Sequence, residues 1–374
     1  MIEIFTSVFI VLSIAYYSFL FFILLGLLRL QNYRQNKYHS ISVIVSARNE
    51  EKNLIPLINH LSNQNYPSTK YEIIIVNDRS SDNTETILKK YSQNLDNLRY
   101  VSIIEQEGNL VGKKNALDKA IAIANGEIIA FTDADCRPTA NWLSAINRQF
   151  IDKVDVVVGY SPLVSHKNKH LLSEILFAIK RLERLSIFAI SAGTIGWNWG
   201  VTCTARNFAY RKSVYNDIGG FSGIGHILSG DDDLMLQKIS KSKRYNLHFV
   251  VDKDSYVPSI EDKSKYEQYQ QEKRRASKWR YYPISIKLIT SIIFVFYILI
   301  IYTFILIFTN DFSWILWLKL IVLKICLEFI LMAKIALSLK ETKRLWIFPL
   351  CEIFYIPYFL SFAILGTLKG YKWK

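Results

Sequence analysis

The chain has little cysteine, and the few cysteines that it has are scattered. Its 374 residues contain four, at positions 136, 203, 326 and 351, without the paired spacing that structural zinc sites use. We therefore expect free thiols, which fit a globular part in a reducing, cytoplasmic compartment. The sequence also lacks internal repeats, and it has no low-complexity segment outside its hydrophobic runs.

Charged residues are missing from two long stretches. Residues 4–28 and 288–309 contain none, and each stretch exceeds the roughly 20 apolar residues that cross a bilayer. Residues 345–368 carry only Glu352 and make a third candidate span. Residues 312–339 are a weaker candidate, because four charges fall in one half of their helical wheel. This segment either spans with its charged side facing other helices or lies in the interface. The four charges are Lys319, Lys324, Glu328 and Lys334.

The first hydrophobic segment favours an uncleaved anchor over a signal peptide. It has Glu3 in place of a basic start, its apolar run is longer than that of a signal peptide, and no small-residue cleavage site is evident. Arg29, Arg34 and Lys37 follow it closely. The positive-inside rule therefore predicts that the next part of the chain lies in the cytoplasm.

The far end of the chain leaves the topology open. Pro349 and Pro357 make residues 345–368 a candidate for a kinked or re-entrant element. The tail at 369–374 is basic and prefers the cytoplasmic side, whereas four spans and an outside N-terminus predict an outside tail. One of the C-terminal segments therefore does not cross, or the tail violates the rule.

Basic residues outnumber acidic ones by 46 to 32, a net charge of +14. Nucleic-acid binding is one interpretation of such an excess. Much of it, however, lies beside hydrophobic segments, at 263–280 and 340–344. Clusters of this kind suit an anionic membrane surface. We therefore expect membrane lipids, and no nucleic acid, among the partners.

Between the hydrophobic ends, residues 38–283 begin with alternating strand-like and helix-like runs. Such alternation predicts an α/β fold whose mostly parallel sheet has helices on both faces. In sheets of this type, ligands bind beyond the carboxyl ends of the strands. Residues 170–190 are amphipathic and predict a helix that either packs in the core or lies on the membrane. The predicted strands are 42–47, 72–76, 99–104 and 127–132, and the predicted helices are 49–63, 82–91 and 113–125.

Acidic residues gather where the predicted strands end. Asp133 and Asp135 follow the fourth strand at i, i+2 and project to the same side of an extended chain. They repel each other unless a cation lies between them. A hard divalent ion suits two carboxylates, and its remaining positions suit phosphate oxygens. Glu50, Asp78 and Asp82 follow the first two strands, so they are expected to reach the same crevice.

Each of these carboxylates also has an ordinary structural interpretation. Asp78 and Asp82 suit turns or helix caps, and the acidic run at 231–233 suits a helix N-terminus. A short D-x-D pattern also arises often by chance. The joint order of three acidic clusters along the chain, with the aspartate pair after a nearly uncharged strand, favours a binding site.

A set of segments then carries a family resemblance. Together they resemble the family 2 glycosyltransferases, and the flanking hydrophobic segments match the membrane-bound branch of that family. The resemblance covers the whole polar stretch and implies a nucleotide-diphospho-sugar-binding domain of the GT-A type. The segments are 45–51, 76–84, 112–117, 132–135, 209–211, 219–221, 230–234 and 271–275.

The resemblance implies roles for matching positions. Glu50 and Asp78 match residues that contact the nucleoside, and Lys113 matches a basic residue near the diphosphate. Asp133 and Asp135 match the pair that binds a divalent metal ion, Mg²⁺ or Mn²⁺.

Two motifs depart from the family pattern. Asp231 matches the catalytic base, but the preceding Glu of the family is Gly230 here and Asp232 follows, so the base is either aspartate. Gln271 and Arg274 match the Gln-x-x-Arg-Trp motif, in which the Trp is associated with acceptor binding in processive polysaccharide synthases. Here Arg275 occupies the position of that Trp, and Trp279 lies one helical turn further on.

The residue types fit one displacement reaction. A divalent ion would stabilise the leaving nucleoside diphosphate as a Lewis acid, and Lys113 and Arg274 would add fixed positive charge. Asp231 would take the proton of the attacking hydroxyl. Attack opposite the leaving group would invert the anomeric centre. We therefore expect an inverting transferase that moves a sugar from a nucleotide-diphospho-sugar to a lipid or lipid-linked glycan at the cytoplasmic membrane face.

The expected organisation is an N-terminal transmembrane anchor at 1–30, a cytoplasmic GT-A-like domain at 38–283 and a membrane region at 284–374 with two or three transmembrane helices. A processive polysaccharide synthase of the same family is one alternative. A sugar-phosphate nucleotidyltransferase is another, although it would show a Gly-rich loop after the first strand, where residues 47–50 have no glycine. A transporter would need more spans, and the complete acidic set argues against a scaffold.

Overall fold

The computed structural model describes the chain except for residues 1, 106–107, 166–169, 261–263, 310 and 369–374. Its contacts divide the chain into two compact units. The sheet unit comprises Arg29–Asn168 and Thr194–Asp262, and the helical unit comprises Met1–Leu28, Lys169–Gly193 and Lys263–Lys374. This division differs from the predicted domain at 38–283, because 169–193 and 263–283 group with the hydrophobic helices.

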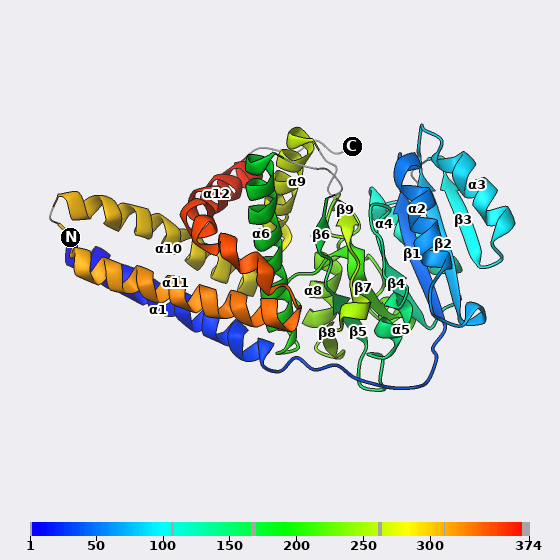
Figure 1. Ribbon diagram of the computed structural model, residues 1–374, viewed down its shortest axis with the longest axis horizontal. Helices are drawn as coiled ribbons and strands as arrows, with labels where there is room; N and C mark the ends of the chain where they lie inside the picture. Colours follow the sequence, from blue (N-terminus) through cyan, green and yellow to red (C-terminus); the bar gives the residue numbers. More distant parts are fainter. Residues whose placement is uncertain (1, 106–107, 166–169, 261–263, 310, 369–374) are drawn as a thin grey trace. The chain divides into compact units, whose positions relative to one another are not determined.

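A seven-stranded sheet of order β3-β2-β1-β4-β7-β5-β8 forms the centre of the sheet unit (Figure 1). Neighbouring strands pair in parallel, except that β7 is antiparallel to both β4 and β5. A mostly parallel mixed sheet was expected, and this fold class is confirmed. The strands are β1 Ile41–Ala47, β2 Tyr71–Asp78, β3 Leu98–Ile103, β4 Ile128–Phe131, β5 Val156–Gly159, β7 Phe208–Arg211 and β8 Leu247–Val250, with a separate parallel pair of β6 Leu163–Val164 and β9 Ser259–Ile260.

Helices cover both faces of the sheet, and the alternation along the strands explains why. Val43 and Val45 of β1 point to one face, where they form a buried cluster with Leu54 and Leu57 of α2. Ile44, between them, is also buried and points to the other face, and α4 packs against β1 and β2 outside that cluster. The helices of this unit are α2 Glu51–Ser62, α3 Thr84–Asn94, α4 Lys113–Ile123, α5 Trp142–Asn147, α7 Lys212–Asp217 and α8 Asp233–Lys241, with short 3₁₀ turns η1 Ser68–Lys70, η2 Ala205–Asn207 and η3 Lys253–Ser255.

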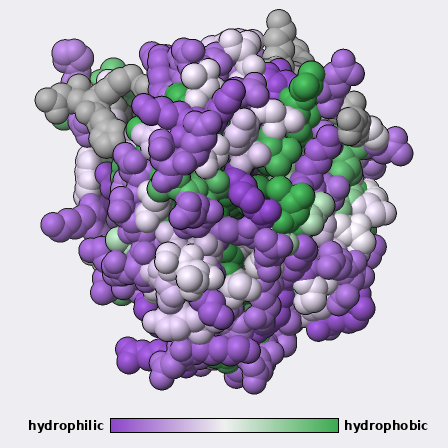
Figure 2. Space-filling view, turned by 90° about the vertical axis from the view of Figure 1, so that its right-hand side faces the viewer, coloured by the Kyte–Doolittle hydropathy of each residue, from purple (hydrophilic) through white to green (hydrophobic). Residues whose placement is uncertain are grey.

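The helical unit contains long apolar helices. Among the residues that the structure describes, three segments are long and apolar enough to cross a membrane, Ile4–Leu27, Ile284–Phe308 and Thr342–Thr367. These are the three better candidates expected from the sequence. Large apolar side chains are exposed along α10, whereas the face of the molecule seen in Figure 2 is largely hydrophilic. The elements are α1 Ile2–Leu27, α6 Leu171–Ile195, α9 Lys265–Ser277, α10 Ile284–Phe308, α11 Trp314–Ser338 and α12 Phe348–Leu368, with 3₁₀ turns η4 Lys278–Tyr281 and η5 Thr342–Ile347.

Two of the four charges of α11, Lys324 and Glu328, face other helices, whereas Lys319 is exposed. Lys324 is 2% exposed, and its Nζ lies 2.8 Å from Glu328 Oε1 and 2.7 Å from Glu352 Oε2 of α12. The Tyr16 hydroxyl of α1 donates to Glu328 Oε1 over 2.6 Å. A cation with two carboxylates therefore ties three helices together in the interior of this unit.

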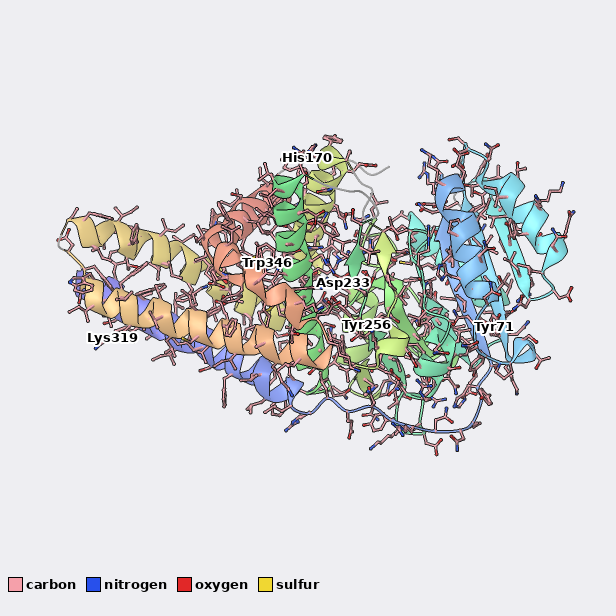
Figure 3. The ribbon with its side chains drawn as sticks, in the orientation of Figure 1. Tyr71, His170, Asp233, Tyr256, Lys319 and Trp346 are labelled. Carbon is pink, nitrogen blue, oxygen red and sulfur yellow. The ribbon has the colours of Figure 1, made fainter. Side chains whose placement is uncertain are left out.

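Removing this cation is expected to destabilise the protein strongly. Lys324→Met leaves two carboxylates side by side without their partner, and breaking a buried ion pair in this way costs about 3–5 kcal/mol. Thermal unfolding of the detergent-solubilised protein measures the effect. Lys319→Met, on the exposed side of the same helix (Figure 3), is the matched control and should leave the melting temperature unchanged. Equal melting temperatures for the two variants would contradict the expectation.

Candidate active site

The aspartate pair lies at the carboxyl end of β4, at the point where the sheet changes from parallel to antiparallel pairing. Phe131 ends the strand, and the turn that follows is closed by a hydrogen bond from the amide of Cys136 to the carbonyl of Asp133. The side chains of Asp133 and Asp135 are 28% and 19% exposed. Two carboxylates are therefore presented together at the sheet edge and remain accessible to a ligand.

Lys113 connects this pair to the acidic run at 231–233. It begins α4, and its Nζ lies 2.6 Å from Asp133 Oδ1 and 3.4 Å from Asp231 Oδ2. Burial lowers the pKa of Lys113, but the charges of Asp133 and Asp231 outweigh that effect and hold the pKa above its usual value. Lys113 is therefore a permanent positive charge between two acidic segments.

A second cation, Arg206, was not predicted from the sequence. Its Nε lies 3.5 Å from Asp133 Oδ2 and its Nη2 lies 3.6 Å from Asp135 Oδ2. Arg206 comes just before β7, and β7 runs antiparallel to β4 with Phe131 opposite Phe208. Residues that precede β7 therefore lie beside residues that follow β4. Only knowledge of that antiparallel pairing would have singled out this arginine.

The acidic run begins at a glycine for a conformational reason. Gly230 has a φ of +83°, and a Cβ at this position would lie 2.5 Å from Leu234 Cδ1. A glutamate in its place would be strained in this backbone. Asp232 is the N-cap of α8 and accepts hydrogen bonds from the amides of Asp233 (2.7 Å) and Ala205 (3.2 Å). The carboxylate of Asp231, 13% exposed, faces Lys113.

Glu50 follows β1, and Asp78 is the last residue of the neighbouring parallel strand β2. Both therefore lie at the same edge of the sheet as the aspartate pair. Glu50 accepts a hydrogen bond from Asn53 Nδ2 (2.8 Å), and Asp78 pairs with Arg79 Nε (2.7 Å). Asp82 instead joins two loops, because its carboxylate accepts from the amides of Glu51 and Thr84. Burial raises the pKa of Asp82, but hydrogen bonds from the side chain and amide of Thr84 and from the amide of Glu51 bring it below its usual value.

Gln271 and Arg274 belong to α9, which is part of the helical unit. The residue in the place of the family's tryptophan, Arg275, is held by two carboxylates. Its Nη1 lies 2.7 Å from Glu183 Oε1 of α6 and 3.0 Å from Glu272 Oε2. This arginine therefore joins α9 to α6 within that unit.

The donor chemistry at the end of β4 fits a divalent cation. Among the residues that the structure describes, no group of three or more His, Cys, Asp or Glu side chains is arranged to hold a metal ion. Asp133 and Asp135 nevertheless offer hard carboxylate oxygens, and two cationic side chains already lie against them. Such a pair suits an ion that takes its other ligands from phosphate oxygens and water.

Lys114 is a second residue that the sequence did not single out. It is 1% exposed, and its Nζ donates to the carbonyl of Ser229 (2.7 Å) and to that of Ile227. The amide of Val111 donates to the carbonyl of Gly225 (3.0 Å). The start of α4 thus holds the backbone that leads to Asp231, while the neighbouring Lys113 contacts its side chain.

Lys114→Met is expected to lower the free energy of unfolding by about 2–3 kcal/mol, because two buried carbonyls lose a charged donor. Urea titration followed by circular dichroism in detergent measures this loss. Lys90→Met, at an exposed position on α3, removes the same charge without such contacts and serves as the control. A variant at position 114 as stable as the control would show that this anchoring is not needed.

Comparison with known proteins finds glycosyltransferases. The family model described as "Glycosyl transferase family 2" matches residues 42–223. The chain is similar to glycosyltransferase AglE of Haloferax volcanii, with 28% identity over 216 residues, 57% of this chain and 64% of that one. It is also similar to the probable glycosyltransferase YdaM of Bacillus subtilis, with 30% identity over 185 residues, 48% and 42% of the two chains.

A third relative is the beta-monoglucosyldiacylglycerol synthase of Trichormus variabilis, with 34% identity over 113 residues, 30% of this chain and 24% of that one. The chain thus matches less than two thirds of the length of each of these relatives. Among solved structures, it is similar to the mannosyltransferase PcManGT of Pyrobaculum calidifontis in complex with GDP-Man and Mn²⁺. The TM-score is 0.60 at 17% identity, over 97% of this chain and 99% of that one. This likeness shows the fold, which is GT-A-like as expected.

Proposed function

We propose that this chain, which belongs to the family 2 glycosyltransferases, transfers a sugar from a nucleoside-diphospho-sugar to a lipid or lipid-linked glycan at the cytoplasmic face of a membrane, with inversion at the anomeric carbon. The observation that carries the proposal is the network of Asp133, Asp135, Lys113, Arg206 and Asp231 at the carboxyl edge of the sheet. It joins opposite charges at the position where ligands bind in sheets of this type.

The donor would bind along this edge. Asp133 and Asp135 would hold a divalent ion, Mg²⁺ or Mn²⁺, which neutralises charge on the leaving diphosphate. A structure of similar fold was solved with GDP-Man and Mn²⁺, which supports this assignment. Glu50 and Asp78, at the ends of β1 and β2, would contact the nucleoside. Lys113 and Arg206 would keep positive charge near the phosphates throughout the reaction.

Asp231 is the better candidate for the base. Both carboxylate oxygens of Asp232 accept backbone amides, one at the cap of α8 and one from Ala205. Asp231 instead presents its carboxylate beside Lys113, with Oδ2 3.4 Å from the Lys113 Nζ. It would take the proton of the acceptor hydroxyl as that oxygen attacks the sugar. One base and one leaving group suffice for a single displacement, which inverts the anomeric carbon.

The acceptor is proposed to be a membrane lipid or a lipid-linked glycan. Along the chain, the sheet unit is preceded by the apolar helix α1 and is followed, after α9, by the apolar helix α10. One relative is a beta-monoglucosyldiacylglycerol synthase. A processive synthase is less favoured, because the family's tryptophan is replaced by Arg275, whose guanidinium is paired with Glu183 and Glu272. A paired guanidinium at this position offers no aromatic face to a growing polysaccharide.

A donor screen tests this proposal. Membranes that contain the protein are incubated with UDP-, GDP- and dTDP-linked sugars labelled in the sugar, and the products are separated into organic and aqueous phases. We expect label from one donor to enter the organic phase, at a rate lowered roughly 10²- to 10⁴-fold with Asp231→Asn. Transfer only to water-soluble acceptors would overturn the lipid assignment, and an undiminished rate of transfer in Asp231→Asn would overturn the assignment of the base.

A further inference from the structure

α10 lies antiparallel to α1 within the helical unit. The ring of Phe5 lies 5.4 Å from that of Tyr302, and the ring of Phe9 lies 5.9 Å from that of Phe296. Residues further along α1 therefore contact residues nearer the start of α10. Figure 1 shows the two helices running together with α11. If α1 crosses a membrane, α10 crosses it in the opposite direction.

α11 lies along α1 in the same direction. The ring of Phe9 lies 6.0 Å from that of Phe312, just before α11, and Tyr16 bonds to Glu328 further along it. A helix of 25 residues is about 37 Å long, enough for a hydrocarbon core of about 30 Å. The charged residues of α11 disfavour it as a membrane span, but its central charges, Lys324 and Glu328, pair with each other inside the bundle. α11 is therefore a crossing helix like its two neighbours.

The two ends of α12 lie on one side of this bundle. Its first residue, Phe348, follows the end of α11 through the short η5 turn. Near its other end, a Cβ on Gly366 would lie 2.4 Å from the Cβ of Ala276, and Arg280 donates to the carbonyl of Thr367. Ala276 and Arg280 immediately precede α10. Because α10 begins on the side where α11 ends, both ends of α12 are on that side.

The middle of α12 reaches the interior of the bundle. Tyr355 and Phe359 lie on either side of Pro357, and their rings lie 6.2 Å and 5.4 Å from that of Tyr297, close to the middle of α10. A proline within a helix removes a backbone hydrogen bond and bends the helix. Figure 1 shows α12 bent, with both ends toward α9.

We propose that α12 is a re-entrant helix whose partner is the lipid bilayer. It enters from the side on which α11 ends, bends at Pro357 near the middle of the membrane and returns. Ile353 and Phe354 are 68% and 53% exposed and face the lipid, while Glu352 is paired with Lys324 in the interior. The chain then crosses three times, by α1, α10 and α11. That the side from which α12 enters is the cytoplasmic side rests on the proposed function.

The distribution of basic residues fits three crossings. The segments 29–37, 340–344 and 369–374 each contain three basic residues, and three crossings place all of them on one side. The segment 309–313 between α10 and α11 contains Asp311 and no basic residue, and it lies on the opposite side. This is the asymmetry of the positive-inside rule. A fourth crossing by α12 would place the basic tail on the wrong side.

Protease protection in intact cells tests the inference. A protease-cleavable epitope tag is placed after residue 374 in one variant and after Asp311 in a second. We expect the tag at 311 to be lost when protease is added outside intact cells, and the tag at 374 to be lost only after the cells are permeabilised. Cleavage of the C-terminal tag in intact cells would show that α12 crosses and would overturn the inference.

Cysteine labelling gives a readout that does not depend on a bulky tag. A membrane-impermeant maleimide should label Asp311→Cys in intact cells and Lys343→Cys only after permeabilisation, and Phe354→Cys should resist it in both cases. Labelling of Phe354→Cys in permeabilised cells would place the bend in water and also overturn the inference. Neither readout requires turnover, so a failed donor screen would leave the topology result valid.

Discussion

Asp133→Ala is expected to lower kcat by roughly 10²- to 10³-fold, the loss typical of removing one fixed electrostatic contact to a developing charge. The variant removes one of the two carboxylates proposed to hold the divalent ion. It also leaves Lys113 and Arg206 without the oxygens that now lie 2.6 Å and 3.5 Å from them. Initial rates with the donor found in the screen, at saturating metal, measure the effect.

Asp96→Ala is the matched control for this variant. Asp96 is an exposed aspartate in the turn between α3 and β3, and its replacement by Ala removes the same charge from the sheet unit. Its kcat should equal that of the unmodified protein. If Asp133→Ala kept full activity while remaining folded, the proposed role of the aspartate pair would be wrong.

Asp231→Asn is expected to lower kcat by roughly 10²- to 10⁴-fold, the contribution of a positioned general base. The amide keeps the size of the side chain but cannot accept the proton of the acceptor hydroxyl. The KM for the donor should change little, because the proposed base acts on the acceptor. Steady-state kinetics with both substrates separates the two constants.

Asp232→Asn distinguishes the two candidate bases. This carboxylate caps α8 and bonds to Ala205, so its replacement should lower the free energy of unfolding by up to about 2 kcal/mol and reduce kcat far less than Asp231→Asn. The reverse order of activities would transfer the role of base to Asp232.

Much of the sheet edge could be predicted from the sequence because it depends on local patterns. The strand at 127–132 was predicted from its apolar run, and the structure has β4 at Ile128–Phe131 with the aspartate pair directly after it. The helix predicted to begin at Lys113 also begins there. Lys113 was assigned to the site from a motif, and it contacts both Asp133 and Asp231.

Other features depend on contacts between distant segments. Arg206 reaches the aspartate pair only because β7 enters the sheet antiparallel to β4, and Lys114 acts on a loop more than a hundred residues further along the chain. Asp82 was expected as a possible cap of α3, but Asn83 holds the N-cap position and Asp82 joins the loops after β1 and β2. No periodicity within one segment encodes such long-range contacts.

The grouping of α6 and α9 with the apolar helices could not be predicted from the sequence either. Both segments are amphipathic and charged, so their composition is that of a soluble domain as much as of a membrane-associated one. The ion pair between Glu183 and Arg275, together with the close approach of Gly366 to Ala276, joins them to each other and to α12. These partners are far apart in sequence and carry no common motif.

The measurement that tests the central claim most directly is nucleoside-diphosphate binding with and without Mn²⁺. Isothermal titration calorimetry of the purified protein, with the nucleoside diphosphate of its donor, isolates the diphosphate site from acceptor and turnover. We expect Mn²⁺ to tighten binding at least about tenfold, or 1.4 kcal/mol, in the unmodified protein and in Asp96→Ala, and to have no effect in Asp133→Ala. An equal effect of Mn²⁺ in Asp133→Ala would contradict the claim that this carboxylate holds the ion that bridges to the diphosphate.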